Sequence, residues 1–230
     1  MTLSLAITSY NRYDLTIESF AQVIDDPRIT DIIILDDCST DGSYERLVKH
    51  FEGNSKVRVI QQARNRGMSL NKHDAIALSN NEWVIIFDSD NVIGKDYLDA
   101  LCSVGEFSHD TLYLPVAANP QFNYREYSSL TITEKNIGRY MGHAMFRCAM
   151  NTCNCLVSRD FYIGTFIRDD KIGCADTINH IYNHLKRGGR LYFVPGMEYF
   201  HLVGPQSGFL ENADYNIKKA KEIENKIMQL

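Results

Sequence analysis

Residues 83–91 read Trp-Val-Ile-Ile-Phe-Asp-Ser-Asp-Asn, an apolar run that passes directly into two carboxylates two positions apart. An unbroken apolar run of this length, bounded by polar residues, predicts a strand buried on both faces of a parallel sheet. In open sheets of this kind the ligand lies beyond the carboxyl ends of the strands, so Asp88 and Asp90 are expected at a binding site. Two carboxylates this close repel each other unless positive charge lies between them, and a divalent cation carrying a diphosphate would supply it. The alternative is a polar turn in which Asp88 caps the next helix.

The composition excludes several classes of protein. The chain has 230 residues, of which 44% are hydrophobic and 23% charged, as expected for one large soluble α/β domain. The net charge of −5 argues against a nucleic-acid-binding surface, which needs a basic stripe. No run approaches the roughly 20 apolar residues of a membrane span, and Met1–Leu5 enters a strand without a charged leader. We therefore expect a cytoplasmic chain without a signal peptide or transmembrane segment, which leaves room only for a peripheral membrane contact.

The first ninety residues alternate strands with helices, which predicts right-handed βαβ units and a parallel sheet. Asp14 is expected to cap the first helix, which Pro27 closes. The second helix is expected to turn Leu47, Val48 and Phe51 inward. The predicted strands are Leu3–Thr8, Ile32–Leu35, Val57–Ile60 and Trp83–Phe87.

The second half is less regular. Residues 117–150 carry Tyr124, Tyr127 and Tyr140, and we expect them to form a partly mobile wall that presents aromatic faces to a sugar, with one short helix. In the terminal helix a narrow apolar stripe is expected at Ile217, Ala220, Ile223 and Ile227. The other predicted strands are Thr111–Val116, Asn154–Arg159, Arg190–Val194 and Met197–His201; the helices are Tyr97–Leu101, Ala175–Lys186 and Ala213–Gln229; the loops are Asp169–Asp170 and Gly204–Gly208.

Polar clusters follow three of the predicted parallel strands, at residues 8–12, 36–41 and 88–91. Such strand ends meet at one crevice. A phosphate-binding loop is excluded because the chain lacks Gly-x4-Gly-Lys, and a dinucleotide site because no Gly-x-Gly-x-x-Gly follows the first strand. A nucleotide site built from side chains and a metal ion remains.

These motifs resemble those of the inverting glycosyltransferases of family 2. The matching segments are Thr8–Arg12, Asp36–Asp41, Arg64–Gly67 and the Asp-x-Asp of residues 88–90, while Asn151–Ser207 match more loosely. The resemblance implies the GT-A fold, a Rossmann-like, mostly parallel mixed sheet flanked by helices. It also implies one domain over residues 1–230, with a nucleotide-sugar half to about residue 110, an acceptor half from about 111 to 207, and a terminal helix from 208.

The resemblance also assigns roles. Asp176 would be the catalytic base, although the family often has Glu-Asp where this chain has Ala175-Asp176, so Asp169 and Asp170 compete for the role. Asp88, Asp90 and His201 would hold Mn²⁺ or Mg²⁺, and an imidazole ligand favours Mn²⁺. The donor would be a nucleotide-diphosphate sugar, with UDP expected, and the acceptor a hydroxyl of a saccharide or glycoconjugate. The nucleotide-binding residues would be Thr8, Tyr10, Arg12, Asp36, Asp37, Arg66, Lys72, Asp88 and Ser89.

Each assignment has a structural alternative. Tyr10 could be a buried tyrosine, Asp36 or Asp37 a helix cap, and His201 a structural histidine. Arg64, Arg66 and Lys72 could form a solvated helix face. The remaining candidates receive no role. Cys153 and Cys155 are expected to be reduced thiols and lack a completed metal-ligand set, and the i, i+4 pair His180 and His184 lacks the adjacent Glu of a zinc protease.

Two other functions compete with sugar transfer. One is a nucleotide-sugar-binding module without turnover. The other is a nucleotidyltransferase that uses the same carboxylates on a sugar phosphate, but such enzymes usually have a Gly-rich first loop with a basic residue, which residues 8–12 do not provide.

Overall fold

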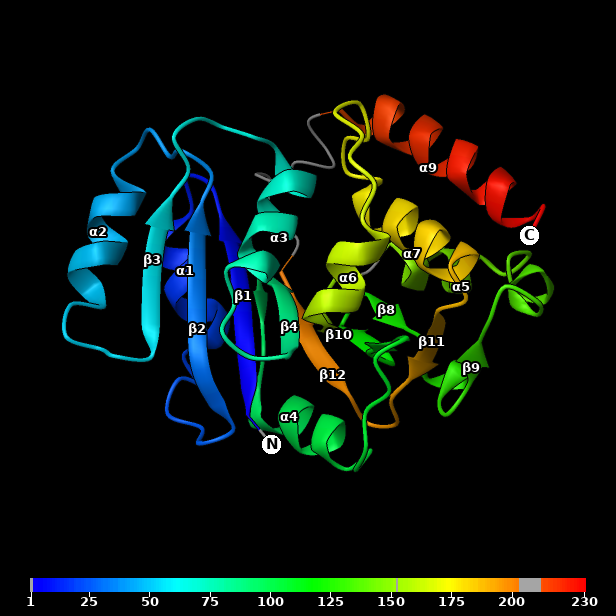
Figure 1. The fold of residues 1–230 in the computed structure, drawn as a ribbon, viewed down its shortest axis with the longest axis horizontal. Coiled ribbons are helices and arrows are strands. Elements are labelled where there is room, and N and C mark those ends of the chain that lie inside the picture. The colour runs from blue at the N-terminus through cyan, green and yellow to red at the C-terminus, as the bar shows by residue number, and fades with distance from the viewer. Residues whose placement is uncertain (1, 152, 203–211) are drawn as a thin grey trace.

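The computed structural model describes residues 2–151, 153–202 and 212–230, arranged as a large central sheet with helices on both faces (Figure 1). The sheet has eight strands in the order β3-β2-β1-β4-β10-β6-β11-β9. The first four in this order are all parallel, as predicted. Their bounds are β1 Leu3–Ser9, β2 Ile29–Asp36, β3 Val57–Gln61 and β4 Trp83–Asp88.

The other half of this sheet is mixed. Strand β10 runs antiparallel to both β4 and β6, whereas β11 is parallel to β6. The reversal allows residues from the second half of the chain to reach the carboxyl end of β4. The bounds are β6 Thr111–Leu114, β9 Thr131–Ile132, β10 Cys155–Ser158 and β11 Arg190–Phe193.

A second, four-stranded sheet has the order β5-β12-β7-β8. Its strands are β5 Asn91–Val92, β7 Ala117–Asn119, β8 Phe122–Asn123 and β12 Glu198–His201. In the antiparallel β5–β12 pair His201 lies opposite Asn91, which brings His201 to the turn that contains Asp88 and Asp90.

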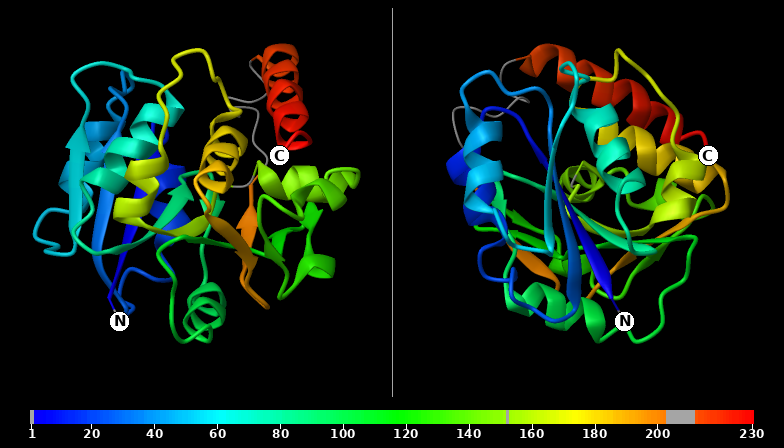
Figure 2. Two further views of the ribbon diagram at one scale, coloured as in Figure 1. Left: turned by 45° about the vertical axis from the view of Figure 1, so that its right-hand side comes forward. Right: turned by 60° about the vertical axis from the view of Figure 1, so that its left-hand side comes forward.

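Helices cover both faces of the large sheet. Helices α1 and α2 pack against each other on one face, whereas α3, α6 and α7 lie together on the other (Figures 1 and 2). Helix α9 packs on α7. The helices are α1 Tyr13–Phe20, α2 Ser43–His50, α3 Met68–Ala77, α4 Lys95–Cys102, α5 Ala144–Met150, α6 Arg159–Thr165, α7 Asp176–Lys186 and α9 Ala213–Ile227, with short 3₁₀ turns η1 Arg125–Tyr127 and η2 Ile137–Arg139.

The apolar strands are buried as the sequence predicts. Leu5, Ile33 and Ile85 are fully inaccessible and lie in neighbouring strands of the parallel half. Such complete burial requires cover on both faces, which the two layers of helices provide. No helix in the described part of the chain combines the length and the apolar character needed to cross a bilayer.

Several predicted details of the helices are wrong. Asp14 lies inside the first turn of α1 rather than at its cap, where a carboxylate still interacts favourably with the helix dipole. Val48 faces outward and is 43% exposed, because the buried side of α2 runs through Leu47. Ile217 is likewise exposed on α9. Arg159 does not end a strand but begins α6, a helix that the sequence analysis did not predict.

The segment 117–150 is also different from expectation. It forms β7, β8, β9, two 3₁₀ turns and α5 rather than a loop with one helix. Tyr124 and Tyr127 are buried in the core, so they cannot offer aromatic faces to a sugar. Tyr140 is only partly buried but packs edge to face on Tyr127 and also against Phe146. The predicted loop Gly204–Gly208 lies outside the described residues.

Leu47 and Val48, which are neighbours on α2, test which side of that helix packs against the core. Leu47→Ala should destabilise the chain by about 2–5 kcal/mol because it removes fully buried methyl groups and leaves a cavity. Val48→Ala, on the exposed side of the same turn, should change stability by no more than about 0.5 kcal/mol. Urea denaturation of both variants measures this difference. Equal losses would show that α2 packs through a different face.

Candidate functional site

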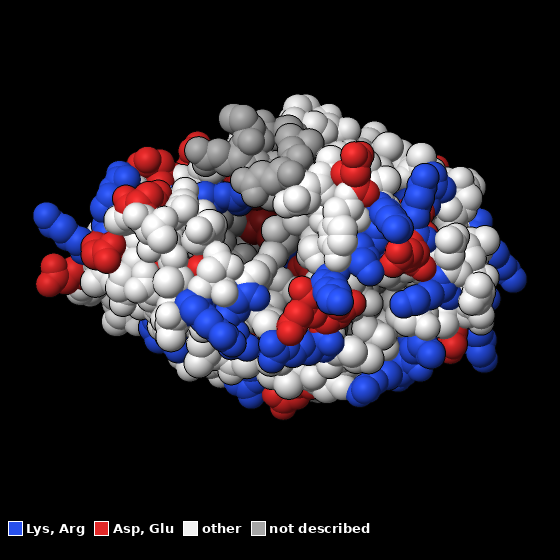
Figure 3. All heavy atoms as spheres, turned by 90° about the horizontal axis from the view of Figure 1, so that it is seen from above, with Lys and Arg blue, Asp and Glu red and all other residues white. Residues whose placement is uncertain are grey.

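The carboxyl ends of β1, β2 and β4 open on a cleft of about 920 Å³. Viewed from above, this end of the molecule has acidic side chains within a hollow and Lys and Arg side chains around it (Figure 3). Of the predicted nucleotide-binding residues, seven line the cleft and two, Asp36 and Lys72, do not. The lining residues are Thr8–Arg12, Asp37, Asp41, Arg64–Asn71, Asp88, Ser89, Arg168–Asp170, Ile172–Cys174 and Asn212.

The loop after β1 is held against the loop after β2. Asn11 adopts a left-handed backbone with φ of 53°, a conformation that Asn tolerates better than most residues. Its N–H donates to Ser39 Oγ at 2.8 Å, and its side-chain oxygen accepts from the Thr40 N–H at 2.8 Å. Tyr10 remains 43% exposed on this loop, so the structure does not support the alternative that it is a buried tyrosine.

The adjacent carboxylates Asp36 and Asp37 have different surroundings. Asp36 is fully inaccessible and accepts from the Ser39 N–H at 2.8 Å and Gln61 Nε2 at 3.1 Å. Asp36 therefore holds the turn together and is not placed to contact a nucleotide, contrary to its predicted role. Asp37 lines the cleft and accepts from the N–H groups of Arg66 at 2.7 Å and Gly67 at 2.9 Å.

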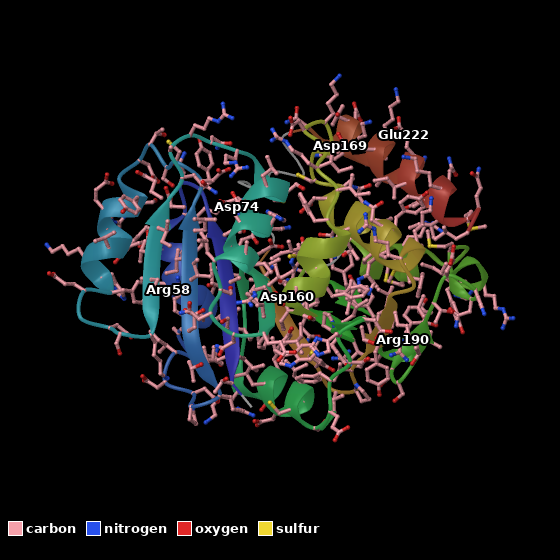
Figure 4. The ribbon with its side chains drawn as sticks, in the orientation of Figure 1. Arg58, Asp74, Asp160, Asp169, Arg190 and Glu222 are labelled. Carbon is pink, nitrogen blue, oxygen red and sulfur yellow. The ribbon has the colours of Figure 1, made fainter. Side chains whose placement is uncertain are left out.

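These contacts set the ionisation of Asp37 and the position of Arg66. Burial raises the pKa of Asp37, and the two N–H donors and the Arg66 charge only partly oppose this effect. The Arg66 guanidinium forms an ion pair with Asp74, which lies on α3 (Figure 4). Asp37 thus ties the loop after β3 to the end of β2, and Arg66 reaches the cleft from a fixed backbone.

Lys72 is buried, with only 3% of its surface exposed, and lies between two of the predicted site residues. Its Nζ is 3.3 Å from Asp88 and 3.1 Å from Asp176. Burial lowers the pKa of Lys72, but the charges of Asp176 and Asp88 outweigh this effect and leave the pKa well above its usual value. Lys72 is therefore not part of a solvated helix face, and it links the ends of β4 and the start of α7 through one cation.

The competing carboxylates lie in different surroundings. Asp176 begins α7 and is 8% exposed, whereas Asp170 is exposed and forms an ion pair with Arg168. Asp169 belongs to the loop that precedes α7, at the end of the molecule where the cleft opens (Figure 4). Hydrogen bonding to Arg168 lowers the pKa of Asp170. A low pKa makes a carboxylate a weak proton acceptor, which argues against Asp170 as the base.

Asp90 and His201 meet near the end of β4. Asp90 forms an ion pair with Arg12 at 2.9 Å. Burial and the neighbouring Asp88 raise the pKa of Asp90, and the charges of Arg12 and His201 oppose them. His201 contacts the Asn91 side chain through Nδ1 at 2.7 Å, which leaves Nε2 as the nitrogen available to a ligand.

These residues fit a divalent cation in chemical type. Two carboxylates and an imidazole are donors that suit Mn²⁺. Ser89 Oγ is buried at the cleft without a hydrogen-bond partner among the described residues. In the part of the chain that the structure describes, no three His, Cys, Asp or Glu side chains are already arranged around a common metal position. An incoming ion would therefore exchange with the pairs formed by Arg12 and Lys72.

One site residue escaped the sequence analysis. Asn154 is buried, its side-chain oxygen accepts from the Asp88 N–H at 2.9 Å, and its backbone oxygen accepts from Tyr97 at 3.0 Å. Asn154 therefore holds the backbone at the end of β4. The sequence shows only an asparagine at the start of a predicted apolar strand. This pattern does not indicate that the side chain would bind the Asp88 backbone.

The model for glycosyl transferase family 2 matches residues 4–155, and the chain belongs to this family. A poly(ribitol-phosphate) beta-glucosyltransferase of Bacillus spizizenii is 31% identical over 102 residues, which are 43% of this chain and 16% of that protein. Glycosyltransferase GlyG of Streptococcus pneumoniae is 26% identical over 100 residues, 43% of this chain and 33% of that protein. The matched segments span less than half the length of the curated relatives.

Solved structures confirm the predicted GT-A fold. S. aureus TarS 1-349 in complex with UDP-GlcNAc has a TM-score of 0.73 at 16% identity, covering 99% of this chain and 70% of that one. The mannosyltransferase PcManGT from Pyrobaculum calidifontis, in complex with GDP-Man and Mn²⁺, has a TM-score of 0.69 at 16% identity, covering 96% and 64%. The likeness extends to the part of the chain after residue 155, which the family model does not match.

Replacing the buried Lys72 tests its ion pairs with Asp88 and Asp176. Lys72→Met should destabilise the chain by about 3–5 kcal/mol at neutral pH, because two carboxylates lose their shared partner. Adding Asp176→Asn to this variant should restore part of the loss, since one uncompensated charge disappears. Lys221→Met on the exposed side of α9 is the control and should have little effect. Urea denaturation measures all three, and a loss no larger than that of the control would contradict the ion-pair arrangement.

Proposed function

We propose that this chain is a metal-dependent inverting glycosyltransferase that moves a sugar from a nucleotide-diphosphate donor to an acceptor hydroxyl. The observation that carries the proposal is the arrangement around Lys72, where the strand-end carboxylate Asp88 and the helix-start carboxylate Asp176 share one cation. One carboxylate lies where a donor diphosphate is expected and the other where an acceptor hydroxyl must lose its proton. Membership in glycosyl transferase family 2 supports this assignment.

The donor is proposed to be a UDP-sugar held at the carboxyl ends of β1, β2 and β4. The exposed ring of Tyr10 can stack on a base, and Thr8, Arg12 and Ser89 lie along the same cleft. Arg66 lines the cleft and would supply positive charge toward a diphosphate, whereas the buried Lys72 does not line it. The complex of TarS with UDP-GlcNAc supports UDP as the nucleotide, whereas PcManGT is named with GDP-Man. In this proposal one domain contains a donor half and an acceptor half.

Asp88, Asp90 and His201 are the residues that would hold Mn²⁺ or Mg²⁺. When bound, the ion neutralises the charge that develops on the departing diphosphate. The structures of PcManGT and GalNAc-T7, both named with Mn²⁺, support a metal in this fold. Arg12, which forms an ion pair with Asp90 within the chain, lines the cleft and would interact with the diphosphate when the ion takes its place at Asp90.

Asp176 is proposed as the base that takes the proton of the acceptor hydroxyl. Inversion needs one carboxylate on the acceptor side, so that the hydroxyl attacks the sugar directly from the face opposite the leaving group. The Lys72 ion pair fixes one oxygen of Asp176 at 3.1 Å and leaves the other for the proton. Curated relatives named for poly(ribitol-phosphate) and for succinoglycan biosynthesis support a saccharide or glycoconjugate as the acceptor. The cytoplasm remains the location expected from the sequence.

The first test of this proposal concerns the metal. Asp90→Ala should weaken Mn²⁺-dependent binding of UDP-GlcNAc by at least about 100-fold, since even residues behind a metal ligand alter affinity by about 10–100-fold. The fold should survive because the Asp90 side chain is only partly buried, in the turn after β4. Asp96→Ala, on the exposed side of α4, is the matched control. Titration calorimetry with and without Mn²⁺ measures the difference, and unchanged metal-dependent affinity in Asp90→Ala would refute the metal assignment.

The second test concerns the base. Asp176→Asn keeps the shape of the side chain but removes proton acceptance, so turnover should fall by about 10²-fold or more while donor binding persists. Asp170→Asn, in the exposed loop, should turn over at nearly the wild-type rate. UDP release from UDP-GlcNAc, with water as the acceptor, measures turnover. The reverse outcome would assign the base to Asp170, and binding without turnover in the wild type would favour a nucleotide-sugar-binding module.

A further inference from the structure

A small internal cavity of about 20 Å³ lies next to the candidate base, between helices α3, α6 and α7 and the large sheet. These three helices lie side by side on one face of the sheet (Figure 1). Its polar walls are formed by Lys72, Asp176, Thr177 and His180, and the ring of Tyr162 closes one side. A cavity of roughly 10–15 Å³ is large enough for one water molecule if two or more polar groups can bind it.

His180 makes this cavity unusual. The side chain is only 7% exposed, yet neither Nδ1 nor Nε2 has a hydrogen-bond partner among the described residues. The ring stacks on Tyr162 with centroids 3.8 Å apart, which fixes its plane. A buried imidazole without partners is unfavourable, and native proteins normally satisfy such groups with protein atoms or ordered water.

The neighbours of His180 restrict how it can be satisfied. Burial lowers its pKa well below the usual value, and the nearby His184 and His73 lower it further, so the ring is neutral and has one donor and one acceptor nitrogen. His184, one turn later, makes contacts of its own to the Asp110 and Arg190 carbonyls at 3.0 Å. The two cysteines in the cavity wall are weak partners, because burial raises the pKa of Cys155 to about 12 and that of Cys153 well above its usual value.

Asp176 is the strongest remaining hydrogen-bond acceptor for a water molecule beside His180. It lies one turn before His180 on the same face of α7, so both side chains reach the same cavity. One Asp176 oxygen is engaged by Lys72 at 3.1 Å, and the other has two lone pairs, so that it can accept a hydrogen bond from a water molecule and still take a proton. A water molecule in the cavity could therefore donate to Asp176 while it bonds to a ring nitrogen of His180.

We propose that this cavity binds one structural water that links His180 to Asp176, so that His180 is a positioning residue for the candidate base. The stack on Tyr162 holds the imidazole, the imidazole orients the water, and the water fixes the rotation of the Asp176 carboxylate. Lys72 holds the same carboxylate from the other side. The structural part of this inference stands by itself, whereas its effect on turnover rests on the proposed function.

A high-resolution crystal structure of the wild-type chain tests the structural part. An ordered water within hydrogen-bond distance of a His180 nitrogen and an Asp176 oxygen is expected. A dry cavity, or a water that contacts neither residue, would overturn the proposal. This measurement needs no activity, so it decides the question even if the wild type releases no UDP and the proposed function fails.

Two substitutions test the effect on turnover. His180→Phe keeps a ring against Tyr162 but removes both nitrogens, and the rate of UDP release from UDP-GlcNAc should fall about tenfold with KM for the donor unchanged. His180→Gln, which retains a donor and an acceptor, should recover much of the lost rate. Thermal unfolding of both variants verifies that they are folded. An unchanged kcat in a folded His180→Phe, or equal losses in both variants, would contradict the positioning role.

Discussion

The two ion pairs that the buried Lys72 forms with Asp88 and Asp176 are the interaction on which the rest of the site depends. A lysine that is 3% exposed would lose its charge if burial acted alone, and it remains charged because Asp88 and Asp176 lie on either side. Asp88 ends a strand of the first half, and Asp176 begins a helix of the second. One cation thus pairs with both carboxylates that the proposed reaction would use, and it joins the first and second halves of the chain at that point.

Other carboxylates near the cleft are also paired with positive groups or N–H donors from distant segments. Arg12 pairs with Asp90, and the loop around Asp37 is held by backbone N–H groups rather than by a further cation. A metal ion with a diphosphate would bring equal and opposite charges into this arrangement, so that binding exchanges one set of ion pairs for another. Such an exchange avoids the large desolvation penalty of burying a charge without a partner.

Local patterns were good predictors where one physical effect dominates. The apolar runs that form β1, β2 and β4 are buried on both faces, since only a parallel sheet covered by helices can take them. Predictions failed where several side chains suit the same buried position and only the packing of the whole fold determines which one is buried. Leu47 and Val48 both suit an inward position on a helix, but only Leu47 meets the core. Tyr124 and Tyr127 looked suitable for sugar stacking, yet their large apolar rings are buried in the core.

The sequence by itself determined that polar clusters follow the buried strands and that Asp88 and Asp90 lie at the carboxyl end of β4, because apolar runs and the parallel topology follow from local composition. Only the tertiary structure decided which carboxylates can act. Asp36 turns into the fold while its neighbour Asp37 lines the cleft, and Asp176 meets Lys72 across the domain. Ion pairs and hydrogen bonds between distant segments depend on how whole elements pack, and local sequence patterns do not contain that information.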